Sequence, residues 1–229
     1  MIVDSSLWQG IDGVVFDFDG TLANCPYDFA RMRRALYAVA ARHGVAREEL
    51  DPLLLLEGID RAAELLGGES EAARAFREEA EEALLQLEIE DAEGAHLLDG
   101  SAAALSALHE AGVKIAIITR NCRQVVSKIM ASAPMPHDAL LTREEVARVK
   151  PHESHLQLAL AAIDVSPERA VMVGDHPIDM ETGRRLEMRT VGVLTGNSSE
   201  SELRAAGADT VVPGVVEVAR LICEARGRA

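Results

Sequence analysis

Six short runs of β-branched and apolar residues recur along this chain of 229 residues, and most of them end at or beside Gly, Asp or Thr. Such runs are typical of strands buried on both faces of a parallel sheet. Segments with apolar residues at three- and four-residue spacing separate the later runs, as in amphipathic helices. The alternation predicts an α/β fold with a doubly wound parallel sheet. The expected strands are Gly13–Phe16, Val113–Thr119, Ala139–Thr142, Ala170–Gly174, Thr190–Leu194 and Thr210–Val212, and the expected helices include Ser101–Ala111, Val125–Ala131, His155–Ile163, Met180–Leu186 and Val215–Ala225, with a further helix opened by a capping box at Ser199 and Glu202.

The span from about Pro26 to His96 has a different composition and residue pattern. It contains no convincing strand and consists of long segments rich in Ala, Leu, Glu and Arg, with breaks at Gly44, Pro52 and Gly67. A helical insert between the first strand and the rest of an α/β chain predicts a small, separate, all-helical cap. We therefore expect a cap domain over residues 25–96 and a core domain over residues 1–24 and 97–229.

The charge balance restricts the possible partners. The chain has 38 acidic and 23 basic residues, a formal net charge of −15. Residues 24–98 carry 17 acids and 8 bases, so −9 of this charge falls on the expected cap and −6 on the rest. Affinity for nucleic-acid phosphates comes from clustered Lys and Arg, so a nucleic-acid partner is excluded. A small anionic substrate remains compatible with this balance, because local charges decide its binding.

Three features bear on the cellular compartment. No stretch approaches the roughly 18 unbroken apolar residues of a membrane helix. The first residues lack the charged-then-apolar layout of a signal peptide. Cys25, Cys122 and Cys223 lie far apart with no CxxC pair, so neither a disulfide framework nor a zinc–thiolate site is expected. We expect a cytoplasmic protein without a membrane partner; the sequence does not indicate its oligomeric state.

Polar side chains stand where several expected strands end. Because the carboxyl ends of parallel strands meet at one edge of an open sheet, these side chains should gather there. Any one of the acids alone would be an ordinary turn or helix-cap residue. Four carboxylates together repel one another unless a cation lies among them, and oxygen-only ligands suit a hard divalent ion, most plausibly Mg²⁺. The expected group comprises Asp17, Asp19, Asp175 and Asp179 with the Thr119 hydroxyl and the Lys150 ammonium.

Four motifs carry these residues: DFDGTL, IITRN, VKP and GDHPID, in that order. They resemble the four motifs of the haloacid dehalogenase-like hydrolase superfamily, over roughly residues 11–23 and 97–220. The resemblance implies a core sheet of strand order 5-4-1-2-3 and, as in the phosphoglycolate phosphatase-like subgroup, an α-helical cap.

The resemblance also implies catalytic roles. Asp17 would be the nucleophile that forms an aspartyl-phosphate. Asp19 would protonate the leaving oxygen and then activate water. Mg²⁺ would be held by the carboxylates of Asp17 and Asp175 and by the main-chain carbonyl of Asp19.

Other positions would bind the phosphoryl group or support the site. Thr119 and Lys150 would hold the phosphoryl group, and Lys150 would also hold the nucleophile in place. The predicted supporting residues are Arg120 and Asn121, which would contact substrate, Asp179, which would orient Lys150 or a metal-bound water, Thr21, which would brace the loop, and His176, which would lie at the rim.

We therefore expect a Mg²⁺-dependent phosphatase acting on a small phosphomonoester similar to phosphoglycolate, a sugar phosphate or a nucleoside monophosphate. Asp19 favours this activity over dehalogenation, because a carbon–halogen bond needs no leaving-group proton. The alternatives are a phosphomutase of the same superfamily and a non-enzymatic phospho-Asp signalling module. In the cap, Arg31 and Arg34 could bind a substrate carboxylate or a second phosphate, although a solvated helix face is the more ordinary explanation.

Overall fold

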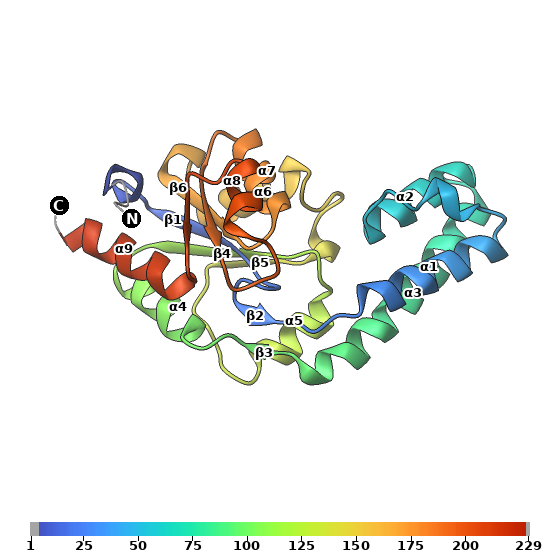
Figure 1. The fold of residues 1–229 in the computed structure, drawn as a ribbon, viewed down its shortest axis with the longest axis horizontal. Coiled ribbons are helices and arrows are strands. Elements are labelled where there is room, and N and C mark those ends of the chain that lie inside the picture. The colour runs from blue at the N-terminus through green and yellow to red at the C-terminus, as the bar shows by residue number, and fades with distance from the viewer. Residues whose placement is uncertain (1–4, 228–229) are drawn as a thin grey trace. The chain divides into compact units, whose positions relative to one another are not determined.

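The computed structural model describes residues 5–227. The chain forms two compact units, one made of Met1–Cys25 with Ala95–Ala229 and the other of Pro26–Gly94. Figure 1 shows the ribbon, in which the first unit contains the sheet and the second contains α1, α2 and α3. None of the helices within residues 5–227 is both long enough and apolar enough to cross a membrane.

The first unit is built on a six-stranded sheet in which every neighbouring pair of strands is parallel. The strands lie in the order β5-β4-β1-β6-β7-β8, so the predicted α/β class and doubly wound sheet are confirmed. If β1, β4, β5, β6 and β7 are numbered 1 to 5 along the chain, the order read from β7 to β5 is the expected 5-4-1-2-3, and β8 is an additional edge strand. The strands are β1 (Gly13–Asp17), β4 (Lys114–Ile118), β5 (Ala139–Leu141), β6 (Ala170–Gly174), β7 (Arg189–Val193) and β8 (Thr210–Val212).

Helices cover both faces of this sheet (Figure 1). On one face α4 (Ser101–Glu110) packs against α9 (Val215–Gly227), and these helices contact β4 and β8. On the other face α6 (Glu153–Ile163) lies over β1, β4 and β5, and α7 (Pro177–Arg185) lies over β6 and β7. The central strands β1 and β6 are buried along their whole length, which explains their unbroken apolar sequence.

The two largest differences from the expected elements lie in α7 and in a short antiparallel pair. Helix α7 begins three residues earlier than expected, because Pro177 occupies its first turn and His176 with Asp179 forms a capping box. A two-stranded antiparallel pair, β2 (Ala23–Asn24) with β3 (His96–Leu97), was not expected, since two-residue strands leave no periodic pattern. The remaining elements of this unit are η1 (Ser5–Trp8), α5 (Arg123–Met130), η4 (Arg143–Glu145), η5 (Pro167–Arg169) and α8 (Glu200–Ala205), whose predicted capping box at Ser199 is present.

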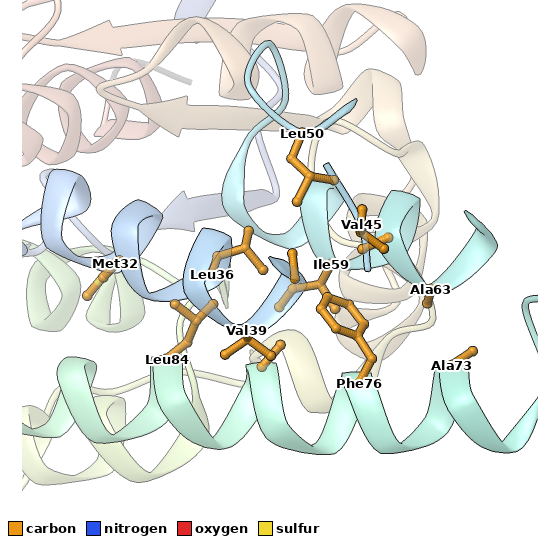
Figure 2. Packing of buried hydrophobic residues seen from close by; sticks show 13 residues of the cluster. Met32, Leu36, Val39, Val45, Leu50, Ile59, Ala63, Ala73, Phe76 and Leu84 are labelled. Carbon is orange, nitrogen blue, oxygen red and sulfur yellow. The ribbon is translucent and has the colours of Figure 1, made fainter. Parts of the chain in front are cut away.

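The second unit is all-helical. It consists of α1 (Phe29–Arg42), η2 (Arg47–Glu49), α2 (Leu55–Leu65), α3 (Glu71–Asp91) and η3 (Ala92–Gly94). Gly44, Gly67 and Gly68 follow helix ends with positive φ, as the sequence breaks indicate. Figure 2 shows that the three helices enclose an apolar core of their own, with the Phe76 ring of α3 among aliphatic side chains of α1 and α2.

Candidate active site

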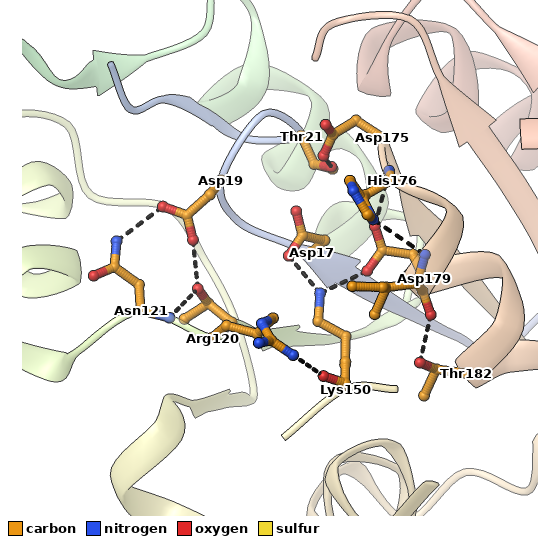
Figure 3. A network of polar contacts seen from close by, with 12 residues as sticks. Asp17, Asp19, Thr21, Arg120, Asn121, Lys150, Asp175, His176, Asp179 and Thr182 are labelled. Atoms are coloured by element: carbon orange, nitrogen blue, oxygen red, sulfur yellow. Dashed lines mark hydrogen bonds and ion pairs between the residues drawn. The ribbon is translucent and has the colours of Figure 1, made fainter. Parts of the chain in front are cut away.

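The loop after β1 forms a tight turn that is closed by main-chain hydrogen bonds. The Phe18 carbonyl accepts hydrogen bonds from the Leu22 and Ala23 amides, both at 2.9 Å. Gly20 adopts a φ of +85°, which the turn requires and which a side chain would strain. The Phe18 side chain is fully buried, and the carboxylates of Asp17 and Asp19 lie at the carboxyl edge of the sheet (Figure 3).

The end of β4 holds the Asp19 carboxylate (Figure 3). Thr119 Oγ1 donates to Asp19 Oδ2 at 2.5 Å, and Asn121 Nδ2 donates to Asp19 Oδ1 at 2.8 Å. The main-chain N–H of Asn121 donates to Thr119 Oγ1 at 2.9 Å, which fixes the orientation of the hydroxyl. Burial raises the pKa of Asp19 and the Asp17 charge raises it further, while hydrogen bonds from Thr119, Cys25 and Asn121 act in the opposite direction.

Lys150 is almost completely buried between two carboxylates. Its Nζ donates to Asp17 Oδ1 at 2.5 Å and to Asp179 Oδ1 at 2.6 Å. Burial alone would lower the pKa of Lys150, but attraction to Asp17 and Asp179 outweighs it, so the net pKa is raised and the ammonium stays charged. The Arg120 guanidinium donates to the Lys150 carbonyl and so holds the segment that carries the lysine.

The end of β6 supplies two further acids. Asp175 directly follows the strand, and its Oδ1 accepts from the Thr21 hydroxyl at 3.1 Å. Asp179 lies in the first turn of α7, and its Oδ2 accepts from the His176 amide at 3.1 Å. Burial and the charges of Asp17 and Asp179 raise the pKa of Asp175 to about 8. The pKa of Asp179 is raised to about 6, chiefly by burial, with Lys150 opposing the rise.

Three of these carboxylates fit a divalent cation. One oxygen from each of Asp17, Asp175 and Asp179 lies within 4.8 Å of the others. Within residues 5–227, only Thr21 donates to Asp175 and only Lys150 to Asp17, each through one oxygen, so the second oxygen of each has no hydrogen-bond donor. Three carboxylates that lie so close together on buried residues repel one another unless a positive charge lies among them. An all-oxygen donor set of this kind suits Mg²⁺.

The structure brings the site residues predicted from the four motifs to one edge of the sheet. Arg120 and Asn121, predicted to contact substrate, have protein partners: the Lys150 carbonyl and the Asp19 carboxylate. Their substrate contacts stay a prediction. His176 is exposed at the rim, and its Nδ1 accepts from the Ile178 amide at 3.2 Å, which caps α7.

Other residues near the site had no place in the sequence prediction. Thr195 and Gly196, which follow β7, reach the loop after β1 and Asp175. The sequence contained a signal for them, because β7 was an expected strand and its carboxyl end lies on the same edge. In the second unit, Arg31 pairs with Glu90 at 2.5 Å, and Arg34 lies 4.0 Å from Asp28, so both have acidic partners within that unit.

A parallel sheet that gathers an Asp-x-Asp pair, a buried lysine, a strand-end threonine and two further acids defines a hydrolytic enzyme of the α/β class. The comparison with protein families gives the particular group. Residues 14–193 match the family described as haloacid dehalogenase-like hydrolase, and the chain belongs to that family.

Among curated proteins, the chain is similar to Pyrophosphatase PpaX of Bacillus mycoides, with 30% identity over 122 residues. That match covers 52% of this chain and 57% of the relative, so it spans little more than half of either protein.

Two solved structures share the fold. One is a predicted phosphoglycolate phosphatase from Haemophilus somnus, with a TM-score of 0.63, 16% identity and coverage of 93% of this chain and 98% of that one. The other is β-phosphoglucomutase from Clostridium difficile, with a TM-score of 0.64, 19% identity and coverage of 95% and 98%. These likenesses concern the fold.

Proposed function

We propose that this hydrolase is a Mg²⁺-dependent phosphatase that hydrolyses a small phosphomonoester through an aspartyl-phosphate on Asp17. The observation that carries the proposal is the pairing of Asp17 with the buried Lys150 ammonium at 2.5 Å, with a second acid, Asp19, two residues away. Lys150 fixes one oxygen of the nucleophile and leaves the other without a donor among residues 5–227. The name of the curated relative, a pyrophosphatase, supports a phosphoryl-group substrate.

The reaction proceeds in two displacements at phosphorus. In the first, the free oxygen of Asp17 bonds to phosphorus, the bond to the leaving oxygen breaks, and Asp19 gives its proton to that oxygen. In the second, Asp19 takes a proton from a water whose oxygen attacks phosphorus, which releases inorganic phosphate and restores Asp17. The raised pKa of Asp19 suits the protonated form that the first step needs.

Positive charge lets an anionic substrate approach an anionic nucleophile. Lys150 and Thr119 would hold the transferring phosphoryl oxygens. Asp17 and Asp175, with the main-chain carbonyl of Asp19, would hold Mg²⁺, and a bound Mg²⁺ would neutralise charge on the phosphoryl group. Asp179 would keep Lys150 in place through its 2.6 Å hydrogen bond.

The helical unit would serve as the cap that selects the substrate. In this proposal residues 25–96 form a domain that closes over the core of residues 1–24 and 97–229 and excludes bulk water during the reaction. Its separate apolar core supports movement as one body. A cap of this kind restricts the substrate to a small molecule.

A panel of phosphomonoesters, assayed for phosphate release with Mg²⁺ and with EDTA, tests the proposal. Wild-type protein should release phosphate only with the metal, and Asp17→Asn should release none while keeping its circular dichroism spectrum. Glucose 1-phosphate separates the phosphomutase alternative, because a mutase would form glucose 6-phosphate in place of free phosphate. Phosphate release that persists in EDTA would contradict the metal requirement.

A further inference from the structure

The loop that follows β7 lies directly against the Asp175 carboxylate. A Cβ placed on Gly196 would overlap that carboxylate and would lie only 2.8 Å from the Asp175 Cβ. The φ of Gly196 is outside the left-handed region, so its backbone conformation does not itself require glycine. Glycine is required at position 196 because Asp175 fills the space that any side chain would occupy.

A second glycine approaches the same carboxylate from the loop after β1. A Cβ on Gly20 would lie 2.5 Å from Asp175 Oδ2. The neighbouring Thr21 hydroxyl donates to the other oxygen, Oδ1, at 3.1 Å. Both oxygens of Asp175 are therefore confined, one by a hydrogen bond and one by two close main-chain segments.

Thr195 ties these two segments together. Its Oγ1 donates to the Gly20 carbonyl at 2.7 Å, although 175 residues separate the two positions in sequence. The Gly20 carbonyl belongs to the Gly20–Thr21 peptide, and only the Gly20 Cα separates this peptide from the one that contains the Asp19 carbonyl, the third ligand in the proposed metal site. A hydrogen bond to the Gly20 carbonyl thus restrains the turn in which the Asp19 carbonyl lies, as well as the distance from Gly196 to Gly20.

We propose that Thr195 and Gly196 are positioning residues of the Mg²⁺ site. Gly196 leaves the volume that the Asp175 carboxylate occupies, and Thr195 holds the Gly20 carbonyl and so restrains the turn that presents the neighbouring Asp19 carbonyl to the cation. The carboxyl end of β7 thereby becomes part of the site, in addition to the strand ends that carry the four motifs. This inference rests on the proposed function, because it requires the metal site at Asp17 and Asp175.

Magnesium affinity tests the inference without an activity assay. Isothermal titration calorimetry of the full chain with MgCl₂ would compare wild type, Gly196→Ala, Thr195→Val and Thr195→Ser, and Gly227→Ala serves as a control because no atom lies within 4 Å of its added Cβ. Loss of a residue that orients a metal ligand costs about 10- to 100-fold in metal affinity. We expect a loss of this size in Gly196→Ala and a smaller loss in Thr195→Val, with wild-type affinity in Thr195→Ser and Gly227→Ala.

Thermal melting in EDTA accompanies each titration and shows whether the variant is folded. Folded Gly196→Ala that binds Mg²⁺ as tightly as wild type would overturn the inference. If Gly196→Ala does not fold, equal affinity in Thr195→Val and Thr195→Ser would overturn it instead. A wild-type protein that binds no Mg²⁺ would refute the metal site itself, and that result is distinct from equal binding by wild type and variant.

Discussion

Replacing Asp175 by asparagine should stabilise the metal-free protein at alkaline pH. In the folded protein, burial and the charges of Asp17 and Asp179 raise the pKa of Asp175 from 3.8 to about 8. The folded state therefore keeps this proton over a pH range in which the unfolded chain has lost it. The stability that protonated Asp175 contributes is complete below about pH 4 and is lost as the pH rises towards 8.

The pKa difference sets the size of this effect. At 1.36 kcal/mol per pH unit, a pKa that rises from 3.8 to about 8 corresponds to a ceiling of about 6 kcal/mol, approached above pH 8. Asparagine keeps the Oδ1 that accepts from Thr21 and carries no charge to bury. In EDTA, Asp175→Asn should match wild type near pH 4 and exceed it by several kcal/mol at pH 8.

Magnesium should narrow this difference. Mg²⁺ at about 100 times its dissociation constant would add about 2.7 kcal/mol to a protein that binds it, and Asp175→Asn should gain much less. Urea unfolding at pH 4 to 8, with EDTA and with Mg²⁺, measures both effects, with Asp164→Asn as an exposed control that should leave the profile unchanged. A wild-type stability in EDTA that stays level or rises over this range would refute the reasoning.

Three further predictions concern buried groups. Lys150→Met should unfold about 3–5 kcal/mol more easily than wild type in EDTA at pH 8, since it leaves Asp17 and Asp179 without their shared cation; urea midpoints equal to those of wild type would contradict this. Asp19→Asn should lower kcat by about 10²- to 10⁴-fold for alkyl phosphates, whose leaving group needs a proton, and much less for p-nitrophenyl phosphate; equal losses would argue against the acid role. Burial and the Lys150 charge lower the pKa of His155 to about 4, so its ring should stay neutral and its NMR signals should not titrate above pH 5. The stability that neutral His155 contributes should be lost as the pH falls from about 6.5 towards 4.

The sequence predicted the parts of this protein that depend on local pattern. Val14, Val15 and Phe16 could be assigned to a buried strand because a strand covered on both faces must be apolar throughout. Asp17 and Asp19 could then be placed at the edge of the sheet, because an apolar strand that ends in charge has a defined direction. The strand order was implied by the family resemblance.

Contacts that depend on how the chain packs could not be predicted. Gly196 reads in sequence as an ordinary turn residue, and its close approach to Asp175 exists only because the sheet places β7 beside β6. Asn121 reads as a substrate contact because its amide is polar and near the motif, yet its Nδ2 donates to Asp19, 102 residues away. In each case the partner is set by the register of neighbouring strands, and one sequence does not specify that register.

The central claim is that Asp17 forms the covalent intermediate, and mass spectrometry of acid-quenched protein tests it most directly. The protein is mixed with Mg²⁺ and a phosphomonoester that it hydrolyses, then quenched and digested. The peptide that contains Asp17 should carry one phosphoryl group, and alkali should remove it. Asp17→Asn should carry none and release no phosphate. Phosphate release by Asp17→Asn at the wild-type rate, with no phosphoryl group on the wild-type peptide, would contradict the account.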